Sequence, residues 1–165
     1  FIHKDKTSES MAKTLDNLEN KLGHDLYREL FPLILTDRGV EFEKVDLFEF
    51  NQETGEFRTN IFYCDAYQSS QKPHVENTHN YIRDIIPNEI DISNITQDDL
   101  DLMFSHINST PRKSLKDKTP YEVFNFMMST SNNPKRGKEI LDLLNIKEIK
   151  RDEVTLKPYL LKRNK

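Results

Sequence analysis

Two acidic residues, Asp37 and Glu76, are the part of this sequence best suited to carry out chemistry. Asp37 follows the apolar run 31–35, which is typical of a buried strand, and Glu76 lies 39 residues further on, near the start of a helix-like stretch. A carboxylate at a strand end can meet one on a helix around shared Mg²⁺ ions, which prefer oxygen ligands. Two such ions, about 3.5–4 Å apart, activate an attacking hydroxyl and stabilise the leaving oxygen. The pair therefore suggests metal-assisted cleavage and transfer of phosphodiester bonds.

Both acids also have structural interpretations, which stay open at this point. An Asp-x-Gly sequence after a strand, as at residues 37–39, commonly forms only a turn. A glutamate in the first turn of a helix is ordinarily a surface residue that the helix dipole favours. Asp65 follows the expected second strand, and we interpret it as a strand-end cap rather than as an accessory acid.

A site of this kind uses three carboxylates, and the sequence offers a suitable context for two. The acid that precedes the first expected helix, Asp5, lies between Lys4 and Lys6 without the pattern of a strand. Residue 1 is Phe rather than Met, so we expect the numbering to begin inside a longer chain. The first acid of the site is therefore expected to lie before residue 1.

Residues that share the helix with Glu76 could assist it. Asn80 and Arg83 follow at i+4 and i+7, and so lie on the same helical face. This stripe could hold one carboxylate on a metal ion and offer Arg83 to a DNA phosphate. The sequence contains no Cys and His cluster suited to zinc, no phosphate-binding Gly-rich loop and no Gly-x-Ser-x-Gly elbow.

The composition indicates a strongly solvated protein. The 165 residues suffice for one domain with a core, and they are 35% hydrophobic and 32% charged. The apolar runs are too short to cross a bilayer, and no secretory signal is visible. The single cysteine, Cys64, fits a reducing compartment and is expected to be a small core residue. We therefore expect a cytoplasmic protein with no membrane partner.

Charge divides the chain into an acidic and a basic part. Residues 1–110 carry 10 Lys and Arg against 21 Asp and Glu, whereas residues 111–165 carry 14 against 7. Basic clusters occur at residues 112–113, 135–138 and 162–165. Such clusters can supply phosphate contacts to nucleic acid, although a solvated basic tail has the same composition.

Hydrophobic periodicity and capping signals predict a mixed α/β chain. Helices are expected at residues 7–22, at 73–86, after Thr96, from Pro120 and at 138–144, and strands at 31–35 and 60–67. The strand at 31–35 should be covered on both faces, and the helix from Pro120 should bury Val123, Phe124 and Met127. Residues 40–50 read as a connector with a short helix, 129–137 as a linker and 154–161 as an extended tail. Two strands are too few for a stable open sheet, so the sheet is expected to be incomplete.

Several blocks in order resemble the integrase core of insertion-sequence transposases of the IS-thirty type. The resemblance covers roughly residues 7–161, and together the blocks are far more specific than any one of them. They read TDRGVEF (36–42), FYCDAY (62–67), HVENTH (74–79), the stretch 100–108, TPRK (110–113), KTPYEVF (118–124) and EVTLKP (153–158), the last resembling Firmicute members.

The resemblance implies an RNase-H-like α/β fold with an Asp-Asp-Glu triad that binds Mg²⁺ or Mn²⁺. Asp37 matches the second acid of the triad and Glu76 the third. Water would first attack DNA at the end of the element, and the freed 3′-hydroxyl would then attack target DNA. The protein would act as a homo-oligomer. The residues expected to contact DNA are Lys72, His74, Asn80, Arg83, Arg112 and Lys113.

The chain departs from the family pattern at its N-terminal end. In the family, the first Asp lies on the first of five strands, and two more strands precede the helix that matches residues 7–22. None of these strands, and no helix-turn-helix region, is found here. We therefore expect an incomplete RNase-H-like core at residues 1–128, followed by a linker, a short helix and a basic tail at 129–165. The chain would be the C-terminal part of a transposase, either excised or a truncated reading frame.

Three functions remain open from the sequence. The first is a piece of a DNA transposase that is inactive by itself, because the first acid is missing. The second is a non-enzymatic remnant or regulatory piece that binds DNA or associates with full-length transposase. The third is a nuclease of the same fold, which would cut DNA without joining it.

Overall fold

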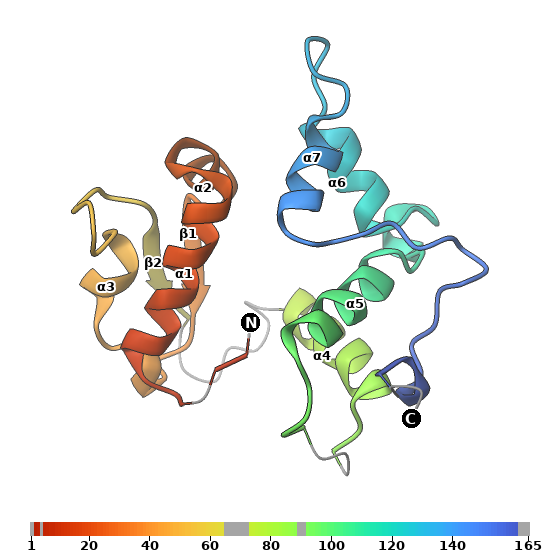
Figure 1. Cartoon of the computed structure of the whole chain (residues 1–165), viewed down its shortest axis with the longest axis horizontal. Coiled ribbons are helices and arrows are strands. Elements are labelled where there is room, and N and C mark those ends of the chain that lie inside the picture. The colour runs from red at the N-terminus through yellow and green to blue at the C-terminus, as the bar shows by residue number, and fades with distance from the viewer. Residues whose placement is uncertain (1, 4, 65–72, 89–91, 162–165) are drawn as a thin grey trace. The chain divides into compact units, whose positions relative to one another are not determined.

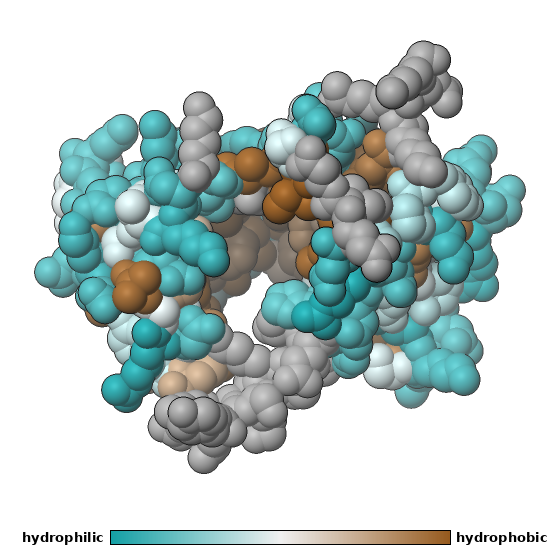
Figure 2. All heavy atoms as spheres, turned by 90° about the horizontal axis from the view of Figure 1, so that it is seen from below, coloured by the Kyte–Doolittle hydropathy of each residue, from teal (hydrophilic) through white to brown (hydrophobic). Residues whose placement is uncertain are grey.

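The computed structural model divides the chain into two compact units, residues 1–72 and 73–165 (Figure 1). It describes residues 2–3, 5–64, 73–88 and 92–161. None of the described helices combines the length and the apolar character that crossing a bilayer requires. Hydrophilic residues make up most of the face drawn in Figure 2, in keeping with a mean hydropathy of −0.76. The predicted division into residues 1–128 and 129–165 stays a prediction.

The first unit surrounds a two-stranded parallel sheet with helices. In the sheet Leu33 lies opposite Asn60 and Thr36 lies opposite Tyr63. The mixed α/β class predicted from the sequence is therefore confirmed. The elements of this unit are α1 (Ser8–Leu22), α2 (His24–Leu30), β1 (Leu33–Thr36), the 3₁₀ helix η1 (Val40–Phe42), α3 (Val45–Glu49) and β2 (Asn60–Tyr63).

The first helix begins at Ser8, one residue after the predicted start, and ends at Leu22 as predicted. The hydroxyl of Thr7 accepts a hydrogen bond from the N–H of Ser10 at 3.2 Å, as an N-cap does. Gly23 ends the helix with φ of +80°, a conformation that side chains disfavour. The next helix, α2, is absent from the prediction because it starts directly after Gly23 without a side-chain cap.

One face of the sheet is covered by helices. Ile34 and Tyr63, which point to this face, pack against a core of Ala12, Phe48 and Ile61. These core residues come from α1, α3 and β2, so the connector between the strands supplies part of the cover. The short helix expected within residues 40–50 is confirmed as α3, with η1 preceding it.

The opposite face of the sheet is exposed. Leu33, Leu35 and Phe62 are 50%, 42% and 54% exposed, because alternate residues of a strand point to opposite faces. The prediction that the strand at 31–35 is covered on both faces is therefore wrong for the described residues. The second strand is also shorter than predicted, since β2 ends at Tyr63; residues 65–67 of that prediction lie outside the described residues.

A buried arginine, Arg58, connects three elements of the first unit. It is 1% exposed and lies just before β2. Its Nε donates to the carbonyl oxygen of Phe48 at 2.8 Å, and its Nη2 donates to that of Leu47 at 2.7 Å. Its Nη1 contacts the carboxylates of Asp16 and Glu19, both on α1. The guanidinium thus joins α1 and α3 to the start of the second strand.

The carboxylate of Glu19 completes this network. It is 4% exposed, and it binds His24 at 2.7 Å and the amide of Asn51 at 2.9 Å. Burial raises the pKa of Glu19, but hydrogen bonds from His24, Asn51 and Arg58 outweigh burial, so that the pKa is lowered overall. Glu19 is therefore held as a carboxylate.

Replacement of the buried guanidinium should destabilise the protein strongly. Arg58→Met removes the donors to two carbonyl oxygens and leaves Glu19 buried without its counter-ion. Breaking a buried pair in this way costs about 3–5 kcal/mol. Urea unfolding followed by circular dichroism measures the loss, with Lys13→Met on the exposed face of α1 as control. A loss no larger than that of the control would contradict the structural role of Arg58.

The second unit is helical. Two capping boxes predicted from the sequence are confirmed, at Thr96 with Asp99 and at Thr119 with Glu122. The helix predicted at 73–86 is also found, with its end one residue earlier. The elements are α4 (Pro73–Ile85), α5 (Gln97–Asn108), the 3₁₀ helix η3 (Lys113–Leu115), α6 (Pro120–Met128), α7 (Arg136–Leu143) and the 3₁₀ helix η4 (Pro158–Leu161).

The pair α6 and α7 differs from the prediction in its bounds and in its buried residues: α7 begins at Arg136 rather than at residue 138, and Val123 and Phe124 are half-buried rather than buried. Gly137, expected in a linker, lies buried within α7, where a Cβ atom would come within 2.5 Å of the Cα of Asn125 on α6. Glycine is therefore required for this close helix contact. Met127 is 73% exposed rather than buried, because Tyr121, at 3% exposed, occupies the buried face of α6 instead.

The end of the chain forms part of the core of this unit. Leu160 and Leu161 pack against Ile85, Met103 and Ile107 from α4 and α5. The tail predicted to be extended therefore ends in the helical turn η4, which brings consecutive leucines onto this core. The tail thus contributes to fixing α4, the helix that contains position 76.

A polar stripe on α5 binds the segment that leads to the tail, which we call the strap (residues 145–155). Ser105 accepts a hydrogen bond from the N–H of Lys147 at 3.0 Å, and Ser109 accepts one from the N–H of Ile149 at 2.9 Å. Four helical residues advance about 6 Å, and two residues of extended chain advance about 6.6 Å. Hydroxyls one helical turn apart can therefore bind alternate residues of the strap.

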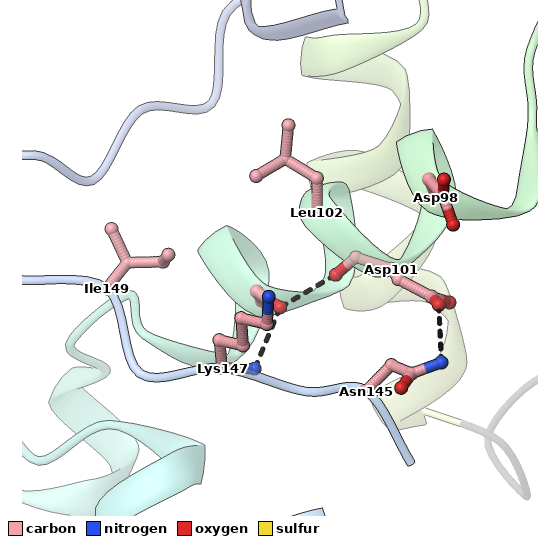
Figure 3. Close-up of a pocket in the computed structure, with 7 residues that line it drawn as sticks. Asp98, Asp101, Leu102, Asn145, Lys147 and Ile149 are labelled. Atoms are coloured by element: carbon pink, nitrogen blue, oxygen red, sulfur yellow. Dashed lines mark hydrogen bonds between the residues drawn. The ribbon is translucent and has the colours of Figure 1, made fainter. Parts of the chain in front are cut away.

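Figure 3 shows the first steps of this contact. The carboxylate of Asp101 accepts a hydrogen bond from Asn145 Nδ2 at 3.0 Å, and the Ser105 hydroxyl donates to the Asp101 carbonyl oxygen at 2.7 Å. A cavity of about 260 Å³ lies between α5 and the strap. None of the residues predicted for the functional site lines this cavity.

His106 binds the far end of the strap. Its Nδ1 accepts a hydrogen bond from the N–H of Thr155 at 3.2 Å, which requires the neutral ring. The side chain is 6% exposed, and burial lowers the pKa of His106 although the charge of Glu153 opposes that shift. His106 therefore binds the strap in its neutral form, and it stays neutral at a pH lower than the usual pKa of histidine.

The stability of the protein should fall in mild acid because of His106. Since the pKa is lower in the folded state, this contribution is complete above the unfolded value of 6.5 and is lost as pH falls towards the folded pKa. His106→Asn keeps an acceptor near the position of Nδ1 without a titrating ring. Urea midpoints of both proteins, measured from neutral pH to about pH 5, should fall more steeply for the wild type. Parallel curves would contradict this role of His106.

Candidate functional site

Asp37 lies at the C-terminal end of β1, as the sequence predicts. Thr36, the last residue of the strand, is 4% exposed, whereas Asp37 itself is exposed to solvent. The Oδ1 atom of Asp37 accepts a hydrogen bond from the N–H of Gly39 at 3.3 Å, which is the turn geometry of the structural interpretation. The turn fixes the loop and leaves the carboxylate accessible.

Both strands of the parallel sheet end at the same edge. The N–H of Cys64 donates to the carbonyl oxygen of Thr36 at 2.8 Å, so that the residues after β1 and β2 begin side by side. In parallel sheets the carboxyl ends of the strands are the usual place for functional groups. Cys64 is buried, as expected for a small core residue.

Glu76 lies in the first turn of α4, within the helix Pro73–Ile85. Asn80 and Arg83, which follow at i+4 and i+7, are in the same helix and are exposed. The side chains of Glu76 and His74 lie outside what the structure describes, and so do residues Asp65 and Lys72. The backbone around Glu76, Asn80 and Arg83 is therefore helical, as the predicted stripe requires.

Asp37 belongs to the first unit and Glu76 to the second. Their meeting around a metal ion stays a prediction. Among the described residues, no group of three or more Asp, Glu, His or Cys side chains could hold a metal ion. Of the two predicted metal ligands, Asp37 is the one whose side chain the structure describes. Its exposed carboxylate offers the oxygen ligands that Mg²⁺ or Mn²⁺ requires, so it fits such an ion.

Arg112 has a neighbour that the sequence did not indicate. Its guanidinium lies over the ring of Tyr81 on α4, with the carbon atom Cζ 5.2 Å from the ring centroid. The Nε atom is buried and has no hydrogen-bond partner among the described residues. A guanidinium on an aromatic face is stabilised by the ring, by about 0.5–1 kcal/mol at exposed sites. Arg112 therefore contacts the helix that contains position 76.

Lys113, predicted to contact DNA, opens a tight loop. The N–H of Arg112 donates to the carbonyl oxygen of Lys118 at 3.0 Å, and the N–H of Asp117 donates to that of Arg112 at 3.1 Å. Lys116 and Asp117 have positive φ of 55° and 60°, which costs about 1–2 kcal/mol for each residue with a side chain. The lysines of this loop, Lys113, Lys116 and Lys118, are exposed.

The sequence blocks indicate Arg112 and Lys113 as DNA contacts but not Lys116 and Lys118. Lys116 and Lys118 alternate with acidic and apolar residues, so they do not form an uninterrupted basic run. Their common position depends on the left-handed backbone at residues 116 and 117, for which the sequence has no glycine marker. The density of four cations within seven residues, although interrupted, was the available signal in the sequence.

Known proteins similar to this chain are insertion-sequence transposases. The chain is 36% identical over 95 residues to transposase InsI of insertion sequence element IS30A from Escherichia coli, which covers 58% of this chain and 24% of that protein. It is 31% identical over 112 residues to the transposase of element IS1086 from Cupriavidus metallidurans, covering 68% of this chain and 31% of the relative. It is 32% identical over 97 residues to the transposase of element IS4351 from Bacteroides fragilis, covering 59% and 28%. No family model and no solved structure matches the chain.

These matches define the class: the chain is homologous to transposases. More particularly, the relatives are transposases of the IS30 family, so the resemblance stated from the sequence blocks is confirmed. The matched segments span between about a quarter and a third of the length of these relatives.

Proposed function

We propose that this chain supplies two carboxylates, Asp37 and Glu76, to the active site of a metal-dependent DNA transposase. The homology to transposases supports the class of reaction. The observation that carries the residue assignment is the exposed carboxylate of Asp37 at the carboxyl edge of a parallel sheet, in a chain whose first described helix after β2 has Glu76 in its first turn. Mg²⁺ or Mn²⁺ is the proposed cofactor.

The proposed fold is RNase-H-like. The order of elements supports it, because a helix precedes β1, the parallel strand β2 follows, and α4 comes next in the chain. A two-stranded sheet is small for an independent domain, and the proposed fold would pair it with further strands. The exposed residues Leu33, Leu35 and Phe62 are consistent with a sheet that another layer covers.

The proposed reaction has two steps at phosphodiester bonds. Water first attacks DNA at the end of the element, and the freed 3′-hydroxyl then attacks target DNA. Asp37 and Glu76 would hold the metal ions, which when bound would activate the attacking hydroxyl and stabilise the leaving oxygen. The Asp37 side chain is held in place by the N–H of Gly39. Arg83, exposed on α4, contacts a DNA phosphate beside the site.

If the two carboxylates share an ion, Mn²⁺ should report it without any catalysis. We expect added Mn²⁺ to broaden the amide NMR signals of residues 36–39 and 75–77 together, because the ion is paramagnetic. Asp37→Asn should remove the broadening at both segments, since it removes a shared ligand. Glu53→Gln, which neutralises an exposed acid in a turn of the first unit, is the matched control and should leave the pattern unchanged.

Two outcomes would count against the proposed site. Broadening near residue 76 that survives Asp37→Asn would separate the two carboxylates. Broadening that both variants remove equally would indicate general attraction of the cation to an acidic unit.

The chain by itself should not complete strand transfer, because it carries two of the three acids that such a site uses. Labelled element ends incubated with the 165-residue chain and Mg²⁺ or Mn²⁺ should remain unjoined. Joined products from this chain would overturn the proposal that a further acid is needed, and products that are cut but never joined would favour a nuclease instead. Asp37→Asn tests whether any product depends on the site.

A second candidate function is a DNA-binding or regulatory remnant that associates with full-length transposase. The exposed lysines within residues 112–118 favour this candidate, because the binding of DNA by these lysines requires no intact catalytic site. Such binding should weaken steeply as salt rises, since each phosphate contact releases counterions. This candidate shares DNA as a partner with the transposase proposal but does not involve Asp37 or Glu76.

A further inference from the structure

The loop at residues 112–118 is held rigidly by its own backbone. Five backbone hydrogen bonds close it, with donor–acceptor distances between 2.9 and 3.2 Å; they run from Arg112 to Lys118, Leu115 to Arg112, Lys116 to Lys113, Asp117 to Arg112 and Lys118 to Leu115. The left-handed residues 116 and 117 bring the chain back on itself. The loop therefore presents its side chains in a fixed arrangement.

Two arginines tie this loop to the rest of the second unit. The guanidinium of Arg112 lies on the ring of Tyr81, and Tyr81 packs against the core formed by α4 and α5. The Nη2 atom of Arg151 donates to the carbonyl oxygen of Asp117 at 3.1 Å. The loop is therefore anchored at both ends, and one anchor is on the helix that contains position 76.

Lysines occupy the outward positions of the loop. Lys113, Lys116 and Lys118 are exposed, and Asp117 is the one acid among residues 112–118. The chain from residue 111 onward carries 14 Lys and Arg against 7 Asp and Glu, so the loop lies in the basic part of the protein. Three ammonium groups on a rigid loop match a polyanion with closely spaced charges, which in duplex DNA lie about 1.7 Å apart along the axis.

We propose that residues 112–118 form a preorganised phosphate-binding loop for duplex DNA, in which Lys113, Lys116 and Lys118 contact phosphates and Arg112 is a positioning residue. This inference rests on the proposed function, because it takes DNA as the partner. It changes the role expected for Arg112: the side chain holds the loop on Tyr81 rather than contacting DNA directly. Preorganisation favours binding because no loop order has to be acquired in the complex.

The lysines can be tested by the salt dependence of DNA binding. Fluorescence anisotropy with a labelled duplex of arbitrary sequence, in EDTA, measures the affinity of the whole chain over a series of salt concentrations. Lys113, Lys116 and Lys118 are replaced together by Gln. We expect affinity to fall roughly tenfold at low salt, and the slope of log affinity against log salt to decrease by about 2.7, or 0.9 for each lost contact.

A triple variant with the same change in charge is the control. Lys147, Lys150 and Lys157 are exposed in the same unit but outside the loop, and their replacement by Gln removes three charges as well. The control should retain the slope of the wild type. Equal losses in both triple variants would overturn the loop as a site, as would the absence of duplex binding by the wild type at low salt. Equally tight binding of a labelled poly-glutamate of similar charge would overturn DNA as its partner.

The role of Arg112 is tested through its aromatic neighbour. Tyr81→Leu removes the ring and should weaken DNA binding about threefold to fivefold, the equivalent of one cation–π contact. The salt slope should stay the same, because the three lysines can still reach phosphates. Tyr81→Phe keeps the ring and should restore wild-type binding, and thermal unfolding of both variants separates this effect from a loss of fold. Unchanged affinity in Tyr81→Leu would overturn the positioning role.

These measurements are independent of the proposed catalytic site. DNA binding in EDTA involves no metal, so the loop test does not depend on a shared ion. If the lysine variants bind DNA like the wild type while Mn²⁺ broadens both acidic segments, the loop alone is rejected. If the lysine variants lose binding but Mn²⁺ does not broaden both segments, the carboxylate site alone is rejected.

Discussion

The first unit depends on one buried cation. The guanidinium of Arg58 binds two carbonyl oxygens of α3 and two carboxylates of α1, so three elements meet at a single side chain that is 1% exposed. A buried charge is costly unless it is paired and hydrogen-bonded, and here Glu19, which pairs with Arg58, also binds His24 and Asn51. Because Arg58 lies two residues before the start of β2, this network also fixes the strand beside β1, and therefore the edge at which Asp37 lies.

In the second unit, neutral groups rather than a buried charge hold separate segments of the chain together. The hydroxyls of Ser105 and Ser109 and the ring of His106 bind the backbone of the strap, and leucines of the tail complete the core beneath α4. Position 76 and the basic loop at 112–118 are both attached to this helix, one through the chain and the other through Tyr81. The candidate catalytic and DNA-contacting residues of this unit thus share one support.

Local signals made much of the fold predictable from sequence. Thr96 and Thr119 each specify a helix start within four residues, and both capping boxes are found. The burial of β1 was not predictable in this way, because an apolar run such as 31–35 does not tell whether a second layer covers it. For the site, Asp37 at a strand end and the helix around Glu76 follow from local patterns. The Arg112–Tyr81 contact and the left-handed turn at Lys116 depend on the chain beyond their neighbours, where periodicity carries no information.

The contact between α5 and the strap constrains how the sequence can change in length. Four residues of the helix advance about 6 Å, whereas two extended residues of the strap advance about 6.6 Å. The distance between the two bonding groups therefore changes by about 0.6 Å from one contact to the next. This drift is small over Lys147 and Ile149, whose N–H groups bind the two serines, and it limits how many successive residues can be bound in the same way. A deletion of one residue between positions 145 and 149 would turn the opposite side of the strap towards the serines, whereas a deletion of two would preserve the facing. Only changes of even length are compatible with this type of contact.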